Sequence, residues 1–303
     1  MTHIATAPST VKILASRRYG TLSPLRYPGG KAALAGLFAD VISSLNLTSA
    51  TYVEPYAGGA GAGIALLRQG LVDRLVINDF DVAVHAFWRS ILEQTEEFVE
   101  LVRTVPLTID EWQVQRAKYR AADTSDPLSL GFAFFYLNRT NRSGVLRGGV
   151  IGGQAQTGNY KIDARFNRTT LAERITEIGK LAEHITVNDR DGRTIIKQYA
   201  KNPSAFMYID PPYVRAGSRL YLNAFDARDH AELAKVVCDV EQAHWLMTYD
   251  IAPMIEELYV NNFQCRYELN YSARHPGLTD ELMIASEGVA RFLKARMQDQ
   301  QPA

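Results

Sequence analysis

The four residues Asp210-Pro211-Pro212-Tyr213 carry the most specific chemistry in the chain, because they directly follow residues 205–209, an apolar run of strand length. In open α/β sheets, ligands bind at the carboxyl ends of the strands. There, the Asp210 carboxylate and a proline carbonyl can accept both N–H bonds of an exocyclic amine, which stabilises charge that develops during transfer. The prolines stiffen the turn, and Tyr213 can stack on a flat base. The tetrapeptide thus indicates chemistry on a nucleobase amine, rather than a proline turn with an incidental acid.

A glycine-rich turn forms the second candidate site. It is Glu54-Pro55-Tyr56-Ala57-Gly58-Gly59, between a strand at 51–54 and a helix at 64–68, and its glycines permit close approach of a ligand to the backbone. About 20 residues further on, Asp79 ends the next strand, where an acid can accept both hydroxyls of a ribose. The alternative is that Asp79 or Asp81 caps the following helix. Together, the turn and the acid favour a cofactor that contains a nucleoside.

Other ligand chemistries find less support in the sequence. No phosphate-binding lysine follows the glycine turn, so a P-loop is not supported. A lysine lies upstream instead, in Arg26-Tyr27-Pro28-Gly29-Gly30-Lys31, which on composition alone is an ordinary surface turn. Cys238, Cys265 and six scattered histidines form no metal-binding pattern, so we expect no metal site.

The distribution of charge is informative because the chain as a whole is neutral. Its 303 residues carry no net charge, so any surface that binds nucleic acid must be local. Residues 136–168 hold six basic side chains and one acidic one, Asp163, in a glycine-rich context. The basic residues are Arg139, Arg142, Arg147, Lys161, Arg165 and Arg168. A long segment of this kind inside a domain is typical of a functional loop, with a solvated surface loop as the alternative for each arginine.

The pattern along the chain predicts an α/β fold with an insertion. The strand–helix–strand unit at 51–79 implies a parallel pair with a right-handed crossover. Helical periodicity then runs to about residue 136, and the α/β alternation resumes after 169 and ends in an antiparallel hairpin, 266–271 with 281–285, at the sheet edge. We therefore expect a lead-in at 1–20, a sheet domain formed by 21–81 and 169–290, an inserted domain at 82–168 and a tail at 291–303.

In their order, these motifs resemble those of the Dam-type (D12 class) N6-adenine DNA methyltransferases. The similarity includes the lysine turn, the glycine turn, Asn78-Asp79 and Asp210–Tyr213, and it spans roughly residues 22–286. Further similar stretches are residues 134–139, 165–167 and 279–284.

The resemblance implies a Rossmann-like methyltransferase sheet with a mostly helical target-recognition insert, and S-adenosylmethionine as methyl donor. The catalytic residues would be Asp210, Pro211, Pro212 and Tyr213. The cofactor contacts would be Tyr27, Lys31, Glu54, Pro55, Tyr56, Gly58, Gly59, Asp79, Asp210 and Asp191, with Asp189 as the alternative to Asp191. The target adenine would be flipped out of duplex DNA, because its N6 is unreachable while stacked.

The insert would bind DNA through Arg139, Asn141, Arg142, Arg147, Lys161 and Arg168, since arginine frequently pairs with guanine. One departure from the family pattern limits which properties the resemblance implies for this chain. Family members that act on GATC place a Tyr-Asn pair before the glycine that corresponds to Gly144, and this chain has Arg142-Ser143 instead. We therefore do not expect GATC as the target.

Alternatives to this function remain open at this level: methylation of adenine in RNA, methylation of cytosine N4, or a DNA-binding relative without activity. Asp at position 210 favours adenine by analogy with the family. No apolar run approaches the roughly 20 residues of a membrane span, and residues 1–16 do not resemble a signal peptide. We expect a cytoplasmic monomer or weak dimer, with a cognate restriction endonuclease as an optional genetic partner.

Overall fold

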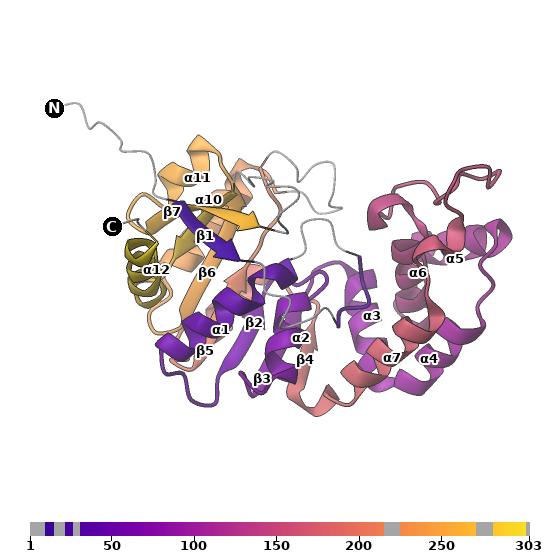
Figure 1. Cartoon of the computed structure of the whole chain (residues 1–303), viewed down its shortest axis with the longest axis horizontal. Helices are drawn as coiled ribbons and strands as arrows, with labels where there is room; N and C mark the ends of the chain where they lie inside the picture. Colours follow the sequence, from indigo (N-terminus) through magenta and orange to yellow (C-terminus); the bar gives the residue numbers. More distant parts are fainter. Residues whose placement is uncertain (1–9, 15–21, 27–30, 215–224, 271–280, 301–303) are drawn as a thin grey trace.

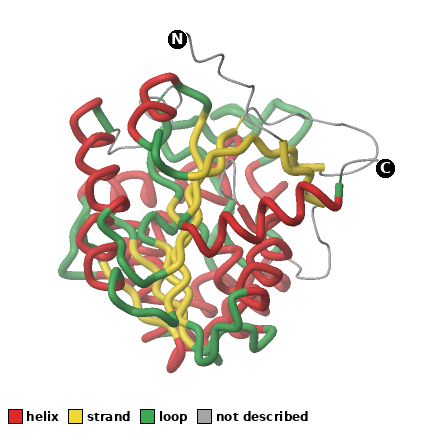
Figure 2. Tube along the Cα trace, turned by 90° about the vertical axis from the view of Figure 1, so that its left-hand side faces the viewer, coloured by secondary structure: helices red, strands yellow, loops and turns green. Residues whose placement is uncertain are grey.

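The computed structural model describes residues 10–14, 22–26, 31–214, 225–270 and 281–300, and Figure 1 shows their arrangement. Eight described strands form one sheet, in the order β1-β7-β8-β6-β5-β2-β3-β4. Their bounds are β1 Thr10–Leu14, β2 Thr51–Glu54, β3 Arg74–Asn78, β4 Ile185–Asn188, β5 Ala205–Ile209, β6 His244–Asp250, β7 Phe263–Asn270 and β8 Glu281–Ala285. Figure 2 shows the strands as a twisted layer with helices on both sides.

The helices group into those that cover the sheet and those of the insert. The first group is η2 Lys31–Leu34, α1 Ala35–Ser44, α2 Gly61–Arg68, η5 Ala182–His184, α8 Gly192–Tyr199, α10 Ala227–Cys238, α11 Pro253–Leu258 and α12 Glu287–Asp299. The second is α3 Val82–Glu93, α4 Thr95–Thr104, α5 Ile109–Ala121, α6 Pro127–Thr140, η3 Arg142–Gly144, η4 Ile162–Arg165 and α7 Arg168–Gly179.

Five neighbouring strands, β4-β3-β2-β5-β6, are parallel, so their carboxyl ends meet at one edge of the sheet. Strands of a parallel sheet are covered on both faces and are apolar throughout, as β5 shows with five buried residues. The alternation of side chains divides the core: Phe206 and Tyr208 join one apolar cluster, whereas Met207 and Ile209 join the other. The predicted Rossmann-like α/β fold is confirmed.

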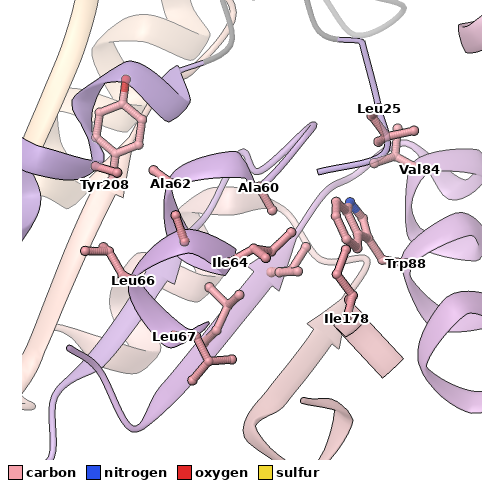
Figure 3. Close-up of a cluster of buried hydrophobic side chains, with 14 of the residues drawn as sticks. Leu25, Ala60, Ala62, Ile64, Leu66, Leu67, Val84, Trp88, Ile178 and Tyr208 are labelled. Carbon is pink, nitrogen blue, oxygen red and sulfur yellow. The ribbon is translucent and has the colours of Figure 1, made fainter. Parts of the chain in front are cut away.

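The cluster that contains Tyr208 continues from the sheet into the insert, so the two parts share a core. Figure 3 shows side chains of α2 next to Val84 and Trp88 of α3 and Ile178 of α7. Further out, α3 packs against α6 through aromatic rings such as Phe87 and Phe135, which stack with centroids 5.9 Å apart. Figure 1 places α4, α5 and α6 at the end of the molecule away from α12.

The structure differs from the expected layout near both ends of the chain, in the place of the hairpin and after residue 168. Residues 10–14 of the expected lead-in form β1, parallel to β7, and residues 291–299 of the expected tail belong to α12, which packs against β1 and β6. The antiparallel pair β7–β8 is confirmed, but it does not lie at the edge, because β8 pairs with β6 and β1 covers β7. Pairing between segments so distant in sequence leaves no local pattern. After the expected boundary at 168, α7 packs against α4 and α3.

Among the described helices, none has the length and apolar character needed to cross a membrane.

Candidate active site at the carboxyl ends of the strands

Asp210 lies where β5 ends, and side chains from three other segments meet it there. Thr248 of β6 donates a hydrogen bond to its Oδ1 over 2.7 Å, and Tyr213 donates to the same oxygen over 3.2 Å. The Lys31 ammonium lies 3.8 Å from Oδ1. The carboxylate is therefore held by two hydroxyls and a cation, an arrangement that fixes its orientation before any substrate binds.

Lys31 belongs to this site although it is far from Asp210 in sequence. Its Nζ donates to Tyr213 over 2.7 Å and to Glu281 Oε2 over 2.8 Å, and its side chain is only 7% exposed. Tyr267 donates to the same Glu281 oxygen. Burial raises the pKa of Glu281, and the charge of Lys31 opposes that rise. Glu281 lies in residues 279–284, one of the stretches similar to the family, but no role was expected for it.

The glycine turn and Asp79 form one unit on the neighbouring strands β2 and β3. The Gly58 N–H donates to Asp79 Oδ2 over 2.9 Å, and the Asp81 N–H donates to Oδ1 over 3.0 Å. Gly58 has φ +48°, which glycine adopts without strain. Asp81, not Asp79, caps α3 by accepting from the Ala83 N–H. The two acids thus have separate roles, and Asp79 holds the turn.

Buried polar groups stiffen the base of this turn. Asn78 donates from Nδ2 to the carbonyls of Pro55 and Arg190, both over 2.8 Å, and ties the turn to the segment before α8. Glu54 accepts from the Gly63 N–H over 3.1 Å. Burial raises the pKa of Glu54 to about 8 and that of Asp79 to about 7. Carboxyls with strongly raised pKa values in one place are typical of functional sites.

Tyr56 and the start of α8 close the other side of the turn. A Cβ on Gly192 would lie 2.4 Å from the Tyr56 ring, so this helix start approaches the ring more closely than any side chain allows. Asp191 caps α8 by accepting from the Arg193 N–H over 2.8 Å. Its carboxylate also pairs with the Arg193 guanidinium over 2.6 Å, which lowers the pKa of Asp191.

Phe80, for which no role was expected, lies directly after Asp79 and is 58% exposed. An exposed phenylalanine beside a partly buried acid offers a flat apolar face to a ligand. Its position directly after an acid at the end of a strand is the sequence feature that could have indicated a role in binding. Tyr27, an expected cofactor contact, lies outside the described residues.

The expected DNA contacts in the insert fall into two groups: side chains that hold the insert together and side chains that lie at its surface. Asn141 is fully buried: it accepts from Trp112 Nε1 over 2.8 Å and donates to the carbonyls of Val145 and Leu146. Arg168 donates to carbonyls at the end of α4, including that of Val102 over 2.8 Å. These two side chains are engaged in building the insert, because buried polar groups must find partners.

Arg142, Arg147 and Lys161 are exposed, as a nucleic-acid surface requires. The first two lie in a loop, residues 142–149, whose ends are joined by the bridge between Asn141 and Val150. Lys161 donates to the Gln156 carbonyl. Exposed, closely spaced arginines on a short closed loop can reach base edges or phosphates.

Arg139 lies in a cluster of four arginines drawn from four segments, the others being Arg26, Arg165 and Arg174. Arg139 donates to the carbonyls of Pro24 and Arg165, and Arg174 donates to that of Ser23. In the described residues, none of the four pairs with a carboxylate. Burial, and then repulsion by the other three, lowers the pKa of Arg139 to about 10. Such uncompensated charge favours an anionic partner.

Asn138 joins this region to the segment that leads to Lys31. It accepts from the Arg26 N–H and donates to the Arg26 carbonyl, both over 2.8 Å, and it also donates to the Gly144 carbonyl over 3.2 Å. The loop of residues 142–149 is thereby attached to residues 22–26.

No curated protein matches the chain significantly. Among solved structures, the rRNA methyltransferase aviRa from Streptomyces viridochromogenes is similar over 91% of this chain and 90% of its own, with 14% sequence identity and a TM-score of 0.35. The family model of the D12 class N6 adenine-specific DNA methyltransferases matches residues 27–272, which include both strand-end sites and the insert. The chain therefore belongs to the D12 class N6 adenine-specific DNA methyltransferase family.

Proposed function

We propose that the protein transfers a methyl group from S-adenosylmethionine to N6 of an adenine that is flipped out of duplex DNA. The observation that carries this proposal is the pair of acids at the ends of adjacent parallel strands. Asp210 on β5 is oriented by hydroxyls and Lys31, and Asp79 on β3 is joined to the glycine turn. A nucleoside cofactor and a target amine can occupy the same edge of the sheet, which is where such folds bind ligands.

The residues present fit S-adenosylmethionine. Asp79 holds the turn with one lone pair of each carboxylate oxygen, which leaves acceptor capacity for ribose hydroxyls. Phe80 and Tyr56 offer rings for an adenine, and the Tyr56 hydroxyl is buried with no hydrogen-bond partner among the described residues. When bound, the cofactor supplies an electrophilic methyl group.

Asp210 would act on the target amine. Its carboxylate accepts an N–H bond of N6, which aims the nitrogen lone pair away from the carboxylate and stabilises the positive charge that N6 gains. N6 would give up one proton, which passes to solvent, for the methyl group it receives, and the donor would leave as a neutral thioether. Tyr213, whose ring lies 6.2 Å from that of Tyr249, supplies a face on which the flipped base can stack.

The described surface supports the proposal of two roles for the insert toward DNA. The arginine cluster around Arg139 would hold backbone phosphates, which position the duplex without reading it. Arg142 and Arg147, exposed on the closed loop, would reach base edges.

The direct test supplies the purified protein and labelled S-adenosylmethionine with duplex DNA, single-stranded DNA or structured RNA, and identifies the product nucleoside by mass spectrometry. N6-methyladenine in duplex DNA is expected. N4-methylcytosine, or label in RNA alone, would instead support one of the other methylation reactions. DNA binding without any label would indicate an inactive relative and contradict the proposal.

Cofactor affinity is expected to depend on pH through Asp79. Ribose hydroxyls donate to the ionised carboxylate, and burial raises the pKa of this group to about 7 in the free protein. Below that pH, Asp79 is protonated and must lose its proton before it can accept from the ribose. The affinity for the cofactor should therefore fall about tenfold from pH 8 to pH 6. Calorimetric titration checks this slope.

Two variants show whether the slope comes from Asp79. Asp79→Asn should bind the cofactor more weakly and with little dependence on pH. Asp81→Asn retains a side-chain acceptor for capping α3 and should keep the slope, moved to slightly lower pH because the charge of Asp81 helps to raise the pKa of Asp79. An unchanged slope in Asp79→Asn would assign it to another group, of which Glu54 is the first candidate.

The double variant Arg142→Ala/Arg147→Ala should weaken DNA binding at least about 30-fold, because each well-placed arginine contact contributes roughly 1–3 kcal/mol and two are lost. Binding by fluorescence anisotropy at several salt concentrations measures the affinity and the salt slope. The control removes the same charge from α12, at the opposite end of the molecule (Figure 1), with Arg291→Ala/Lys294→Ala. Equal effects of the two pairs would argue against a DNA surface on this loop.

A further inference from the structure

Two buried hydroxyls, those of Thr248 and Tyr208, form a hydrogen-bonded chain that ends at Asp210. The parallel register pairs Ile209 of β5 with Met247 of β6, which brings Thr248 beside Asp210. Thr248 is 0% exposed and Tyr208 is 4% exposed. The distances are 2.7 Å from Thr248 Oγ1 to Asp210 Oδ1 and 2.6 Å from the Tyr208 hydroxyl to Thr248 Oγ1.

The direction of these hydrogen bonds follows from the number of protons. A threonine hydroxyl has one proton to donate, and an ionised carboxylate can only accept. Thr248 must therefore donate to Asp210, and it can bond Tyr208 only as the acceptor. The Tyr208 proton points to Thr248, and the Thr248 proton points to Asp210, so the three groups form a chain with one polarity.

This chain distinguishes the two oxygens of Asp210. Thr248, Tyr213 and Lys31 all approach Oδ1, at 2.7, 3.2 and 3.8 Å. Among the described residues, no hydrogen bond reaches Oδ2. Oδ1 thus accepts hydrogen bonds from the protein itself, whereas Oδ2 retains its capacity to accept.

We infer that Thr248 and Tyr208 are positioning residues, which hold Asp210 through Oδ1 so that Oδ2 accepts the N–H of the amine that is methylated. This inference rests on the proposed function of the site. Valine has nearly the shape of threonine and would fill the same core position, but it cannot donate. A hydroxyl at a fully buried position of a parallel strand is thus needed for its hydrogen bond, not for packing.

The test compares Thr248→Val, Thr248→Ser and Tyr208→Phe on the DNA substrate of the wild type. Thr248→Val removes the donor to a charged group and should lower kcat about 10- to 100-fold, with the KM for S-adenosylmethionine within about twofold because the glycine turn and Asp79 are unchanged. Thr248→Ser keeps the donor and should restore most of kcat. Tyr208→Phe removes only the second link and should cost less, about 3- to 10-fold.

The readouts separate this role from a structural one. Wild-type kcat in Thr248→Val would overturn the inference. So would a Thr248→Ser variant as slow as Thr248→Val, because loss of activity would then follow packing rather than the hydroxyl. If Thr248→Val does not fold, which thermal unfolding reveals, the serine and phenylalanine variants still decide, since full kcat in Tyr208→Phe together with low kcat in Thr248→Ser contradicts the chain.

A wild type that methylates none of the substrates would refute the proposed function, not this hydrogen-bond chain. The ¹³C resonance of the Asp210 carboxyl, assigned with Asp210→Asn, then tests the chain without activity. It should move in Thr248→Val and return in Thr248→Ser, and an unmoved resonance would overturn the inference.

Discussion

Asp210→Asn is expected to lower kcat for methyl transfer by about 10³-fold, the loss seen when a group that stabilises transition-state charge is removed. Asparagine has the same shape, and its carbonyl oxygen can still accept from Thr248, which lies 2.7 Å from Oδ1. Its amide NH₂ would then replace Oδ2 and present a donor to the N–H of the substrate amine. The variant should therefore fold normally and lose the reaction.

Single-turnover kinetics with labelled S-adenosylmethionine measures this loss, and thermal unfolding verifies the fold. Asp73→Asn is the control, since Asp73 is exposed before β3, away from the carboxyl ends of the strands. Activity of Asp210→Asn within tenfold of the wild type would show that the carboxylate is not the acceptor of the amine proton.

Lys31 explains how two carboxylates can share this site. Asp210 and Glu281 both face its ammonium, at 3.8 and 2.8 Å, and a single cation between two acids keeps them from repelling each other in a partly buried place. Because Tyr213 also accepts from Lys31 and donates to Asp210, the ring and the carboxylate are fixed relative to each other. The carboxylate that would accept from the amine and the ring that would stack on the base are thus positioned together.

The sequence predicted the parts of this fold that leave a local pattern. Strands β2, β3 and β5 were expected from apolar runs, and each occurs where the run does. Asp79 and Asp210 could then be assigned to one sheet edge, because parallel strands end at the same edge. The geometry of a parallel sheet makes neighbours of residues that are far apart in the chain.

Side-chain partners could not be predicted in this way. Thr248 looked like any residue of an apolar strand, and only the register of β5 with β6 brings it to Asp210. Asn141 was expected among the DNA contacts, yet its side chain is buried and accepts a hydrogen bond from Trp112. A polar side chain in a glycine-rich loop can either face solvent or form hydrogen bonds with the backbone of the loop. The sequence does not distinguish the two cases, because both use the same polar atoms.

Gly144→Ala is expected to reduce DNA affinity about 10- to 100-fold by displacing the loop of residues 142–149. Gly144 has φ +75°, and a Cβ there would lie 2.5 Å from the Arg26 carbonyl oxygen, a backbone atom that Asn138 also holds. The alanine therefore adds conformational strain and a collision, which together cost roughly 2–4 kcal/mol. The loop can escape only by leaving residues 22–26, and Arg142 and Arg147 move with it.

Two glycines near Gly144 separate these effects. Gly153 also has positive φ, +75°, but nothing lies within 4 Å of its Cβ position, so Gly153→Ala tests strain alone. Gly149 has neither feature, and Gly149→Ala should bind DNA as the wild type does. DNA affinity and thermal unfolding of the three variants should rank Gly144→Ala as most affected, Gly153→Ala next and Gly149→Ala last. If Gly144→Ala binds DNA as tightly as Gly149→Ala, then the attachment of this loop to the segment before Lys31 does not contribute to recognition, and the arginines must reach DNA independently of it.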